Sequence, residues 1–393
     1  AQYALSAPFT ERFFDIAVDG GFVGLINSNA WTKRDFGKAL IQKVLPRHDL
    51  QKVVDTSGCY IPGHGTPTLL LFGRHRKPTD AGVVAVLGKR GERDVPDDAA
   101  TAPVWSEIAR SHTKVGYDGV SISVEQIPRA SLARHPWALS GGGARSLLER
   151  LETSAPHNLA HVADDIGFSV IVGEDDAFIR PPWAARGLPA SPFVTGDLIR
   201  DWEEQANTSV LRPFRWSDLE VEADPALTSA LWAWRRLLEE RIVSGSTSMK
   251  VAKRAWFDLR RLSRSKHQTQ LMIAYAEIST HNHFVLSRER KLFAGTAPVI
   301  KLKAEATEDQ YQSLLGFLNS SACGFWGRLN FFQKGGDQVG AGARLSKTPW
   351  QDRLQMAGNL LQQLPVPKLE HLRDKLLEFV VAAEETVQQM SEH

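Results

Sequence analysis

Three short apolar runs near the start of the chain most constrain its fold. They are FVGLI at Phe22–Ile26, LQKVVD at Leu50–Asp55 and TLLLF at Thr68–Phe72. Apolar runs of about four to eight residues between turn signals are typical of strands buried on both faces of a sheet. Helical spacing at residues 9–18, with Thr10 as the expected cap, and at residues 33–45 predicts helices around the first run. The alternation predicts one edge of an α/β sheet.

The chain beyond this sheet has a mixed texture. Residues 75–105 are polar and rich in Pro, Asp and Ala, which predicts a loop or linker, and Tyr117–Ile127 alternates like a strand. Helical apolar stripes follow at Glu308–Asn319 and at residues 350–364, and a charged amphipathic helix is expected at residues 368–392. We therefore expect three parts: an α/β part at 1–145, a mixed α+β domain at 146–345 and a C-terminal helical segment at 346–393.

Composition excludes several protein classes. The net charge of the 393 residues is +2, so any nucleic-acid surface must be a local patch. Two cysteines cannot build a disulfide framework, which fits a reducing cytoplasm. The sequence has no signal-peptide pattern and no run of about 18 apolar residues, so we expect a cytoplasmic protein without a membrane span. The chain starts without Met and enters a helical pattern almost at once, so we expect a piece of something longer.

The most informative stretch is GCYIPGHGTPTLLLFG at Gly58–Gly73, which leads from one predicted strand into the next. Loops at the edge of an α/β sheet commonly hold ligands. Tyr60 in this loop is a candidate for stacking on a nucleotide base, because enzymes that modify a base flip it out of the duplex and hold it against aromatic side chains. The alternative is that Tyr60 packs beneath the loop.

Two strings resemble the later motifs of the gamma-type adenine-N6 DNA methyltransferases. They are GGFVGLINSNAW at Gly20–Trp31 and VVDTSGCYIPGHGTPTLLLFGR at Val53–Arg74. The PGHGTPT loop and the segments after it look most like the large methyltransferases of BREX (phage growth limitation) defence systems, over the whole chain. The resemblance implies an S-adenosylmethionine-dependent enzyme that marks host DNA, a Rossmann-like sheet ending in these strands, and Tyr60 stacked on the flipped adenine.

The departures from that family matter equally. The family binds S-adenosylmethionine at a glycine-containing turn after its first strand, and no such strand and turn occur here. Arg180-Pro181-Pro182-Trp183 imitates the catalytic Asn-Pro-Pro-aromatic motif, but Arg has no acceptor for the adenine amino group. We therefore expect the cofactor site and the catalytic motif to lie upstream of residue 1 or on a partner chain, and no methyl transfer by this chain alone.

A target-recognition module is expected from about Leu147. Three strings resemble the recognition domains of single-chain restriction–modification enzymes, and two further strings resemble both those enzymes and the specificity subunits of type I systems. They are His161–Phe178, Val194–Trp202, Ala255–Leu262, Leu314–Ser321 and Leu364–Lys368. The resemblance implies double-stranded DNA as a partner, and possible contacts with a missing methyltransferase part and with other defence proteins.

A basic cluster lies inside the expected module. Its members are Lys250, Lys253, Arg254, Arg260, Arg261, Arg264 and Lys266, with Trp256 and Phe257 among them. Lys and Arg contact phosphates, and Arg can also pair with a guanine edge, so these seven side chains are candidates for DNA contact. The alternative is a solvated helix face whose aromatic residues pack inward.

A second candidate for DNA contact is THNHFVL at Thr280–Leu286. Asn282 could pair with adenine, and His281 and His283 could contact bases or phosphates. The literal His-Asn-His does not have the spread of a nuclease motif. Metal binding by His281 and His283 is the less favoured alternative to DNA contact. Cys59 and His64 lack two further ligands at a suitable spacing, so we expect no metal site.

These features together predict part of a site-specific adenine-N6 DNA methyltransferase that contributes the base-stacking loop and the recognition of DNA sequence. A DNA specificity protein without catalysis, recruiting a separate enzyme, is the alternative from another class. A protein-interaction module within a defence assembly is a third possibility.

Overall fold

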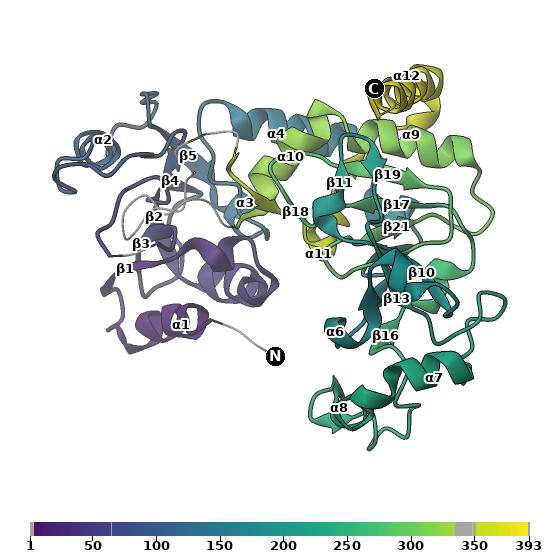
Figure 1. The fold of residues 1–393 in the computed structure, drawn as a ribbon. Helices are drawn as coiled ribbons and strands as arrows, with labels where there is room; N and C mark the ends of the chain where they lie inside the picture. Colours follow the sequence, from purple (N-terminus) through teal and green to yellow (C-terminus); the bar gives the residue numbers. More distant parts are fainter. Residues whose placement is uncertain (1–3, 64, 335–347, 349–350, 392–393) are drawn as a thin grey trace. The chain divides into compact units, whose positions relative to one another are not determined.

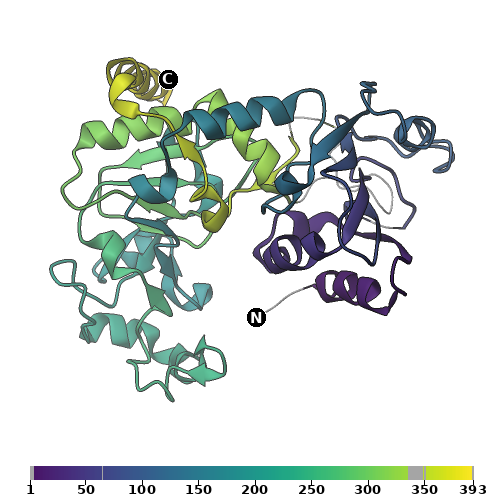
Figure 2. The ribbon, with the colours of Figure 1, turned by 180° about the vertical axis from the view of Figure 1, so that it is seen from behind.

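The computed structural model describes residues 4–63, 65–334, 348 and 351–391. The chain forms two compact units, which the ribbon views show from opposite sides (Figure 1; Figure 2). The first unit comprises Ala1–Ser154 and Trp326–Gln355, and the second comprises Ala155–Phe325 and Met356–His393. This division differs from the three expected domains, because the chain returns to the first unit before it ends in the second.

Specific contacts account for this difference. In the first unit, Lys33 Nζ donates to the carbonyl of Phe331 at 3.0 Å, and the Arg34 guanidinium lies 4.3 Å from the ring centre of Phe332. In the second unit, helix α12 (Arg373–Ser391) packs against helix α9 (Glu308–Leu318). The two helices approach closely at Gly316, where a Cβ atom would lie 3.2 Å from side-chain atoms of α12.

A five-stranded mixed sheet forms the centre of the first unit. Its strands are β1 (Phe22–Ser28), β2 (Asp49–Asp55), β3 (Thr68–Arg74), β4 (Gly82–Gly88) and β5 (Ile122–Pro128). The order is β1-β3-β2-β4-β5, with β2 and β4 parallel and every other pair antiparallel. The strands predicted at residues 22–26, 50–55, 68–72 and 117–127 are all present, the last of them beginning five residues later than expected.

The prediction of a linker at residues 75–105 is wrong. Strand β4 lies between β2 and β5, and its Val83, Ala85 and Leu87 side chains are fully or almost fully buried. The same stretch contains the start of helix α2 (Pro103–Ser111). The run GVVAVLG is itself strand-like, but the Pro and Asp residues after it dominate the composition of the segment.

The helix predicted at residues 33–45 is a series of short turns instead. They are η2 (Asp35–Gly37), η3 (Leu40–Val44) and the start of η4 (Leu45–Arg47), and η1 (Asn29–Thr32) precedes them. Gly37 packs directly on the backbone of Trp31, where a Cβ atom would lie 1.8 Å from the carbonyl oxygen, and this packing interrupts the helical path. The first predicted helix is present as α1 (Ser6–Ile16), but Thr10 lies within it and does not cap it.

The core of the first unit lies between the sheet and these turns. Phe14, Trp31, Ile41, Leu69 and Leu71 have no exposed surface. Apolar side chains also remain on the surface near α1, β1 and β3. They are Leu5, Phe9, Phe13, Ile16, Val18, Phe22, Ile26 and Phe72, each between 41% and 77% exposed.

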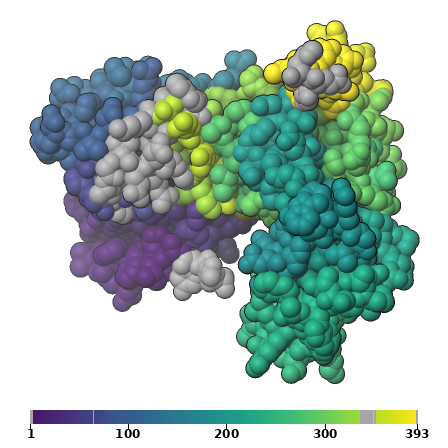
Figure 3. Space-filling view, in the orientation of Figure 1, coloured from purple at the N-terminus to yellow at the C-terminus, as the bar shows by residue number. Residues whose placement is uncertain are grey.

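Two four-stranded sheets organise the second unit. One has the order β20-β10-β13-β9 and the other β19-β17-β21-β7. Their strands are β7 (Asp165–Gly167), β9 (Ile179–Arg180), β10 (Ala190–Val194), β13 (Thr208–Leu211), β17 (Met272–Tyr275), β19 (Phe284–Ser287), β20 (Leu292–Phe293) and β21 (Val299–Lys301). Helices α7 (Pro225–Leu231) and α8 (Arg235–Glu240) lie at one end of this unit, where they form the green surface at the foot of Figure 3.

Short elements complete the described chain. The remaining strands are β6 (His157–Asn158), β8 (Val170–Ile171), β11 (Ile199–Arg200), β12 (Glu203–Glu204), β14 (Ile242–Ser244), β15 (Thr247–Ser248), β16 (Arg261–Leu262), β18 (Ile278–Ser279), β22 (Phe332–Gln333), β23 (Leu354–Gln355) and β24 (Pro365–Val366). The remaining helical elements are α3 (Arg129–Leu132), α4 (Ala144–Ser154), α5 (Leu159–Val162), α6 (Asp175–Phe178), η5 (Pro182–Ala185), η6 (Gly196–Leu198), η7 (Trp232–Trp234), η8 (Arg264–His267), α10 (Ser321–Asn330), α11 (Gly358–Leu361) and η10 (Leu369–His371).

The predicted C-terminal helices are confirmed in part. The helix expected at residues 308–319 is α9, which begins with a capping box between Thr307 and Gln310. The charged helix expected at residues 368–392 is α12. The helix expected at residues 350–364 shrinks to the four residues of α11, and residues 349–350 lie outside the described range.

None of the helices that the structure describes is both long enough and apolar enough to cross a membrane.

Candidate nucleic-acid interface

One edge of the first unit's sheet collects the ends of three strands that run in the same direction. Strands β1 and β2 are each antiparallel to β3, and β2 is parallel to β4, so Ser28, Asp55 and Gly88 end their strands at a common edge. Ligands of α/β proteins bind at the carboxyl ends of such strands. The loop at residues 56–67 follows β2 and therefore starts at this edge.

Tyr60 lies in this loop with its side chain partly exposed. Its backbone N–H donates to the Glu92 carboxylate at 2.5 Å, and the other oxygen of Glu92 accepts from Val104 N–H at 2.9 Å, in the first turn of α2. The backbone of Glu92 in turn donates to the carbonyl of Gly58 at 2.9 Å. Glu92 therefore holds the position of the Tyr60 backbone and caps α2 with one carboxylate.

Close packing fixes the start of the same loop. A Cβ atom on Gly58 would lie 2.9 Å from the Cα of Gly91, so the two backbone segments meet where a larger residue would not fit. Cys59 packs against a small cluster that contains Val54 and Val86. Burial raises the pKa of the Cys59 thiol to about 12, so the thiol is neutral and unreactive at pH 7.

A partly buried acid and a partly buried amine, Asp55 and Lys33, lie at the same edge. Burial raises the pKa of Asp55, and burial lowers the pKa of Lys33 to about 8, while the opposite charge of each partner acts against the shift. Asp55 also accepts from Ser57 N–H at 2.9 Å, at the entrance to the Tyr60 loop. The pair was not singled out from the sequence, because its members are 22 residues apart and belong to no local motif.

The basic cluster of the second unit divides into exposed and engaged side chains. The segment is a run of turns with β16 and η8, not the helix face considered from the sequence. Trp256 and Phe257 pack against the core, with their rings perpendicular and their centres 5.6 Å apart. The exposed cations are Lys250, Lys253, Arg261 and Arg264, and Arg264 also pairs with Glu220 at 3.0 Å.

Three members of the predicted basic cluster are half-buried or buried, and two of them have polar partners within the fold. Arg254 pairs with Asp258 at 2.5 Å and donates to two backbone carbonyls. Lys266 is 95% buried and pairs with Asp165 at 2.7 Å. Arg260 packs on Gly173, where a Cβ atom would lie 2.7 Å from its side chain. We therefore propose no DNA contact for Arg254 and Lys266, whose charged groups are paired within the fold, whereas DNA contact by Arg260 stays a prediction.

A shallow hollow of about 380 Å³ lies beside two of the exposed cations. Its lining includes Phe168, Arg261, Ser263 and Arg264, and the Arg261 guanidinium lies 5.4 Å from the ring centre of Phe168. A cation over an aromatic face beside a second arginine is a suitable surface for an anionic group.

The predicted DNA-reading residues at 281–283 also differ in their surroundings. The amide nitrogen of Asn282 donates to the carbonyls of Leu318 at 2.8 Å and Ser320 at 3.0 Å, so it closes the end of α9 and is not presented to a base. We therefore correct the expectation that Asn282 pairs with adenine. His281 is exposed, whereas His283 is buried, and burial lowers the pKa of His283 to about 4, which keeps its ring neutral at pH 7.

The Arg180–Trp183 stretch adopts a short turn. The Arg180 guanidinium donates to the carbonyls of Asp176 and Ile179 at 2.7 and 2.9 Å, and the Trp183 side chain is 71% exposed on η5. The expectation that this string only imitates a catalytic motif stays a prediction.

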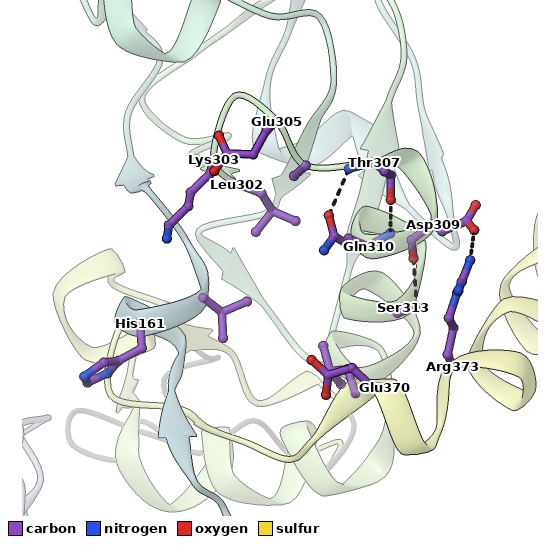
Figure 4. Close-up of a pocket in the computed structure, with 13 residues that line it drawn as sticks. His161, Leu302, Lys303, Glu305, Thr307, Asp309, Gln310, Ser313, Glu370 and Arg373 are labelled. Carbon is purple, nitrogen blue, oxygen red and sulfur yellow. Dashed lines mark hydrogen bonds and ion pairs between the residues drawn. The ribbon is translucent and has the colours of Figure 1, made fainter.

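A larger cavity of about 740 Å³ lies near the start of α9 (Figure 4). Several polar groups around it satisfy one another: Thr307 and Gln310 form the capping box, and Arg373 pairs with Asp309. Because these groups are engaged in holding α9 and α12, the cavity does not present an evident reactive set.

The comparison with curated proteins decides the relationship of the chain. It is 36% identical over 385 residues to the adenine-specific methyltransferase PglX of Streptomyces coelicolor, and the match covers 93% of this chain and 32% of that protein. The chain is a relative of an adenine-specific methyltransferase. The resemblance predicted from the sequence is thereby confirmed.

Two further methyltransferase-like proteins match the chain. It is 24% identical over 222 residues to the type II methyltransferase M.XhoI of Xanthomonas vasicola, which covers 53% of the chain and 38% of that relative. It shares its fold with the type IIL restriction–modification enzyme MmeI, solved in complex with DNA, with a TM-score of 0.52, 12% identity and coverage of 98% of this chain and 44% of that one.

The extent of these matches is also a finding. The chain spans about a third of the length of the curated relatives, 32% of one and 38% of the other. No model of a known protein family matches the chain. The methyltransferase relationship therefore applies to a part of a longer architecture.

Proposed function

We propose that this chain works as part of a site-specific adenine-N6 DNA methyltransferase of a phage-defence or restriction–modification system. In this proposal it supplies the loop that stacks on the flipped adenine and the domain that reads the DNA sequence. The observation that carries the proposal is the similarity to an adenine-specific methyltransferase along 93% of the chain, which includes the Tyr60 loop.

The placement of Tyr60 supports the base-stacking role. The residue follows a strand whose carboxyl end lies at the edge where α/β proteins bind ligands. Its backbone is held by Glu92 while its side chain keeps partial exposure. A fixed backbone with an accessible aromatic face is what holding an extrahelical base requires.

Two glycines near the carboxyl ends of β4 and β2, Gly88 and Gly58, do not offer an open backbone position for S-adenosylmethionine. Gly88, which ends β4, has no open space beside its Cα for a ligand, because a Cβ atom there would lie 2.7 Å from the Asp55 carboxylate. The space beside the Cα of Gly58 is likewise occupied by the backbone of Gly91. We propose that the cofactor is bound by the portion of the longer protein that this chain does not match.

The surface of the first unit supports such a longer assembly. Strand β1 is an edge strand among the described strands, and Phe22 and Ile26 on it are 72% and 60% exposed. Phe72 lies opposite Gly24 on β3 and is 41% exposed on the same face. Contiguous exposed apolar side chains beside an open sheet edge are typical of a surface that another segment covers. We propose that the rest of the methyltransferase sheet continues from β1.

The four exposed cations supply the proposed DNA contacts. Lys250, Lys253, Arg261 and Arg264 stand in the unit that the resemblance assigns to target recognition, and two of them border the hollow beside Phe168. Phosphate contacts of this kind position a protein on a duplex without reading its sequence.

The stacking role is tested in the longer protein by Tyr60→Ala, with Tyr60→Phe as the conservative variant. Stacking on a base contributes about 1–3 kcal/mol, so Tyr60→Ala should lower the transfer of a labelled methyl group to DNA by about 5- to 150-fold. Tyr60→Phe should retain most activity. 2-Aminopurine placed at the target base should report loss of stabilised flipping in Tyr60→Ala alone.

Tyr117→Ala is the matched control, because Tyr117 donates to Glu107 at 3.2 Å in the same unit but outside the loop. Equal loss of transfer in Tyr60→Ala and Tyr117→Ala, or undiminished transfer in Tyr60→Ala, would contradict the stacking role.

A DNA specificity module that recruits a separate enzyme is the second candidate. The poor fit of Gly58 and Gly88 to the cofactor favours it. The distinguishing measurement is methyl transfer with the catalytic part supplied as a separate protein. Activity restored in trans supports the recruiting module, whereas activity confined to one continuous protein supports the first proposal.

A further inference from the structure

Three potential metal ligands converge in the second unit from two separate segments. Asp201 occupies the turn between β11 and β12, and His281 and His283 lie between β18 and β19. One ligand atom from each of the three side chains lies within 4.8 Å of the others. The two imidazole ring centres are 4.2 Å apart, and His283 Nδ1 lies 3.9 Å from the Asp201 carboxylate.

The backbone that carries the two histidines is tied down on both sides. Ser279 Oγ donates to the carbonyl of His281 at 2.6 Å. The amide of Asn282, the residue between the two histidines in sequence, donates to the carbonyls of Leu318 and Ser320. The two histidines therefore project from a fixed loop, which lowers the entropic cost of bringing their rings to one ion.

The backbone that carries Asp201 is fixed by a tight hairpin turn. Arg200 pairs with Glu203, so Asp201 and Trp202 form a two-residue loop, and their φ angles of +48° and +72° are those of a type I′ turn. The paired strands on both sides therefore set the position from which the Asp201 side chain projects. The Asp201 N–H donates to His283 Nδ1 at 3.3 Å, and its carboxylate is 80% exposed and free to rotate.

Two imidazoles and one carboxylate are a ligand set for zinc and similar divalent transition metals. Thr280 Oγ1 lies 2.8 Å from His281 Nδ1, an outer contact that orients the ring and leaves its Nε2 available. Ligands about 2.0 Å from zinc in tetrahedral geometry stand about 3.3 Å from one another. Rotation of the exposed Asp201 and His281 side chains can close the remaining gap.

We propose that Asp201, His281 and His283 bind one divalent transition-metal ion of the zinc type. The ion links the β11–β12 turn to the loop before β19, and a fourth position stays open to water. This proposal departs from the sequence-based expectation of no metal site, since Asp201 stands 80 residues before His281 and no sequence spacing reveals it. The site is independent of the proposed methyltransferase function.

The test uses the full 393-residue chain after treatment with a chelator. Zn²⁺ is titrated against a competing chromophoric chelator, and Co²⁺ is added in a parallel sample to read the coordination from its visible absorption. We expect one tight ion per chain and the spectrum of a four-coordinate site with nitrogen and oxygen ligands. His281→Ala and Asp201→Asn should each weaken Zn²⁺ binding at least tenfold, and Asn tolerates the left-handed turn.

The matched control is the pair His157→Ala and His161→Ala. These rings are stacked with centres 5.7 Å apart, and His161 Nδ1 contacts the neutral Asn158 side chain at 2.7 Å. Zn²⁺ should also raise the melting temperature of the wild type and of this control but not of His281→Ala. Lack of stoichiometric binding, or binding lost in the control and retained in His281→Ala and Asp201→Asn, would overturn the proposal.

Discussion

Asp49 is a carboxylate with almost no exposed surface that lies between two arginines. It pairs with Arg76 at 3.0 Å and with Arg129 at 3.1 Å, and its side chain is 1% exposed. A buried charge persists only when partners compensate its lost hydration. The three side chains therefore hold β2 to the segments that follow β3 and β5.

Removing this charge should destabilise the first unit. Asp49→Asn leaves two guanidinium groups without their counter-ion, and breaking a buried pair costs about 3 kcal/mol or more. Urea unfolding measures the change. The control is Asp118→Asn, whose partner is Lys89 and whose side chain is 65% exposed, with an expected change below about 1 kcal/mol. Similar losses in both variants would contradict the assignment.

His267 predicts a pH dependence of stability in the second unit. Burial, followed by the positive charges of Lys301 and Lys266, lowers the pKa of His267 to about 4, and its Nε2 lies 3.0 Å from Ser169 Oγ. The unfolded chain takes up a proton near pH 6.5 while the folded chain does not. Stability from this group is therefore complete above pH 6.5 and declines as the pH falls toward 4.

Between pH 7 and pH 5 this loss should amount to about 2 kcal/mol for the wild type. His267→Gln should be less stable at pH 7 but should lose less on acidification. Urea unfolding at both pH values checks the difference, with His371→Gln as a surface control. Parallel losses in wild type and His267→Gln would exclude His267 as the cause. His283, whose pKa is lowered in the same direction, contributes equally to both proteins.

Individual site residues could be predicted from sequence only where their role is local. The loop that holds Tyr60 has a recognisable glycine- and proline-rich pattern between strands, but the stacking role of Tyr60 rests on the family resemblance and stays a prediction. The partners of Asn282 lie 36 and 38 residues away, and those of Lys266 and Asp201 lie about as far or farther. Nothing in the neighbouring sequence indicates such contacts, so the charged and polar side chains were assigned to DNA by composition alone.

At the scale of elements, Glu92 joins the Tyr60 loop to α2. Helix α2 begins with Pro103 after Ala102, and Ala102 makes no capping hydrogen bond of its own. The Glu92 carboxylate supplies that cap by accepting from the N–H of Val104, twelve residues later, and its negative charge suits the helix N-terminus. Loop and helix should therefore loosen together.

Glu92→Ala should expose the Tyr60 and Val104 amides to solvent. Loss of a helix cap costs about 1 kcal/mol, which corresponds to roughly fivefold faster hydrogen exchange where opening is local. Amide exchange followed by mass spectrometry measures both segments. The control is Glu125→Ala, which removes a partly exposed acid on β5, outside both segments. Arg93→Ala is not a suitable control, because Arg93 pairs with Asp352. Faster exchange in one segment alone would contradict the joint anchor.

Element prediction succeeded where periodicity was strong. The buried strands β1, β2 and β3 and the amphipathic helix α9 have unbroken patterns of the right length. It failed at β4, whose apolar run lies beside a Pro- and Asp-rich segment. It failed again at residues 33–45, where helical spacing is present but the tertiary packing of Gly37 on Trp31 breaks the helix into turns.

At the scale of the whole molecule, sequence reasoning predicted a sheet followed by a mixed recognition part. The two compact units follow one another along most of the chain, but two later segments depart from this simple order. Trp326–Gln355 belongs to the first unit, and α12, which packs on α9, belongs to the second. Long-range returns of this kind leave no mark in local composition. They depend on which apolar faces fit one another after the elements have formed.

The central claim is that the second unit binds duplex DNA and selects a sequence. The most direct test is binding of the chain to a randomised duplex pool at about 50 and 200 mM salt, followed by sequencing of the bound fraction. We predict enrichment of a short adenine-containing motif and affinity that falls steeply with salt. Alanine at Lys250, Lys253, Arg261 and Arg264 together should reduce the salt slope by up to about 3.6, whereas alanine at the acid-paired Arg215 and Arg236 should leave it unchanged. Salt-independent binding to protein alone, or no DNA binding by either this chain or the longer protein, would contradict the account.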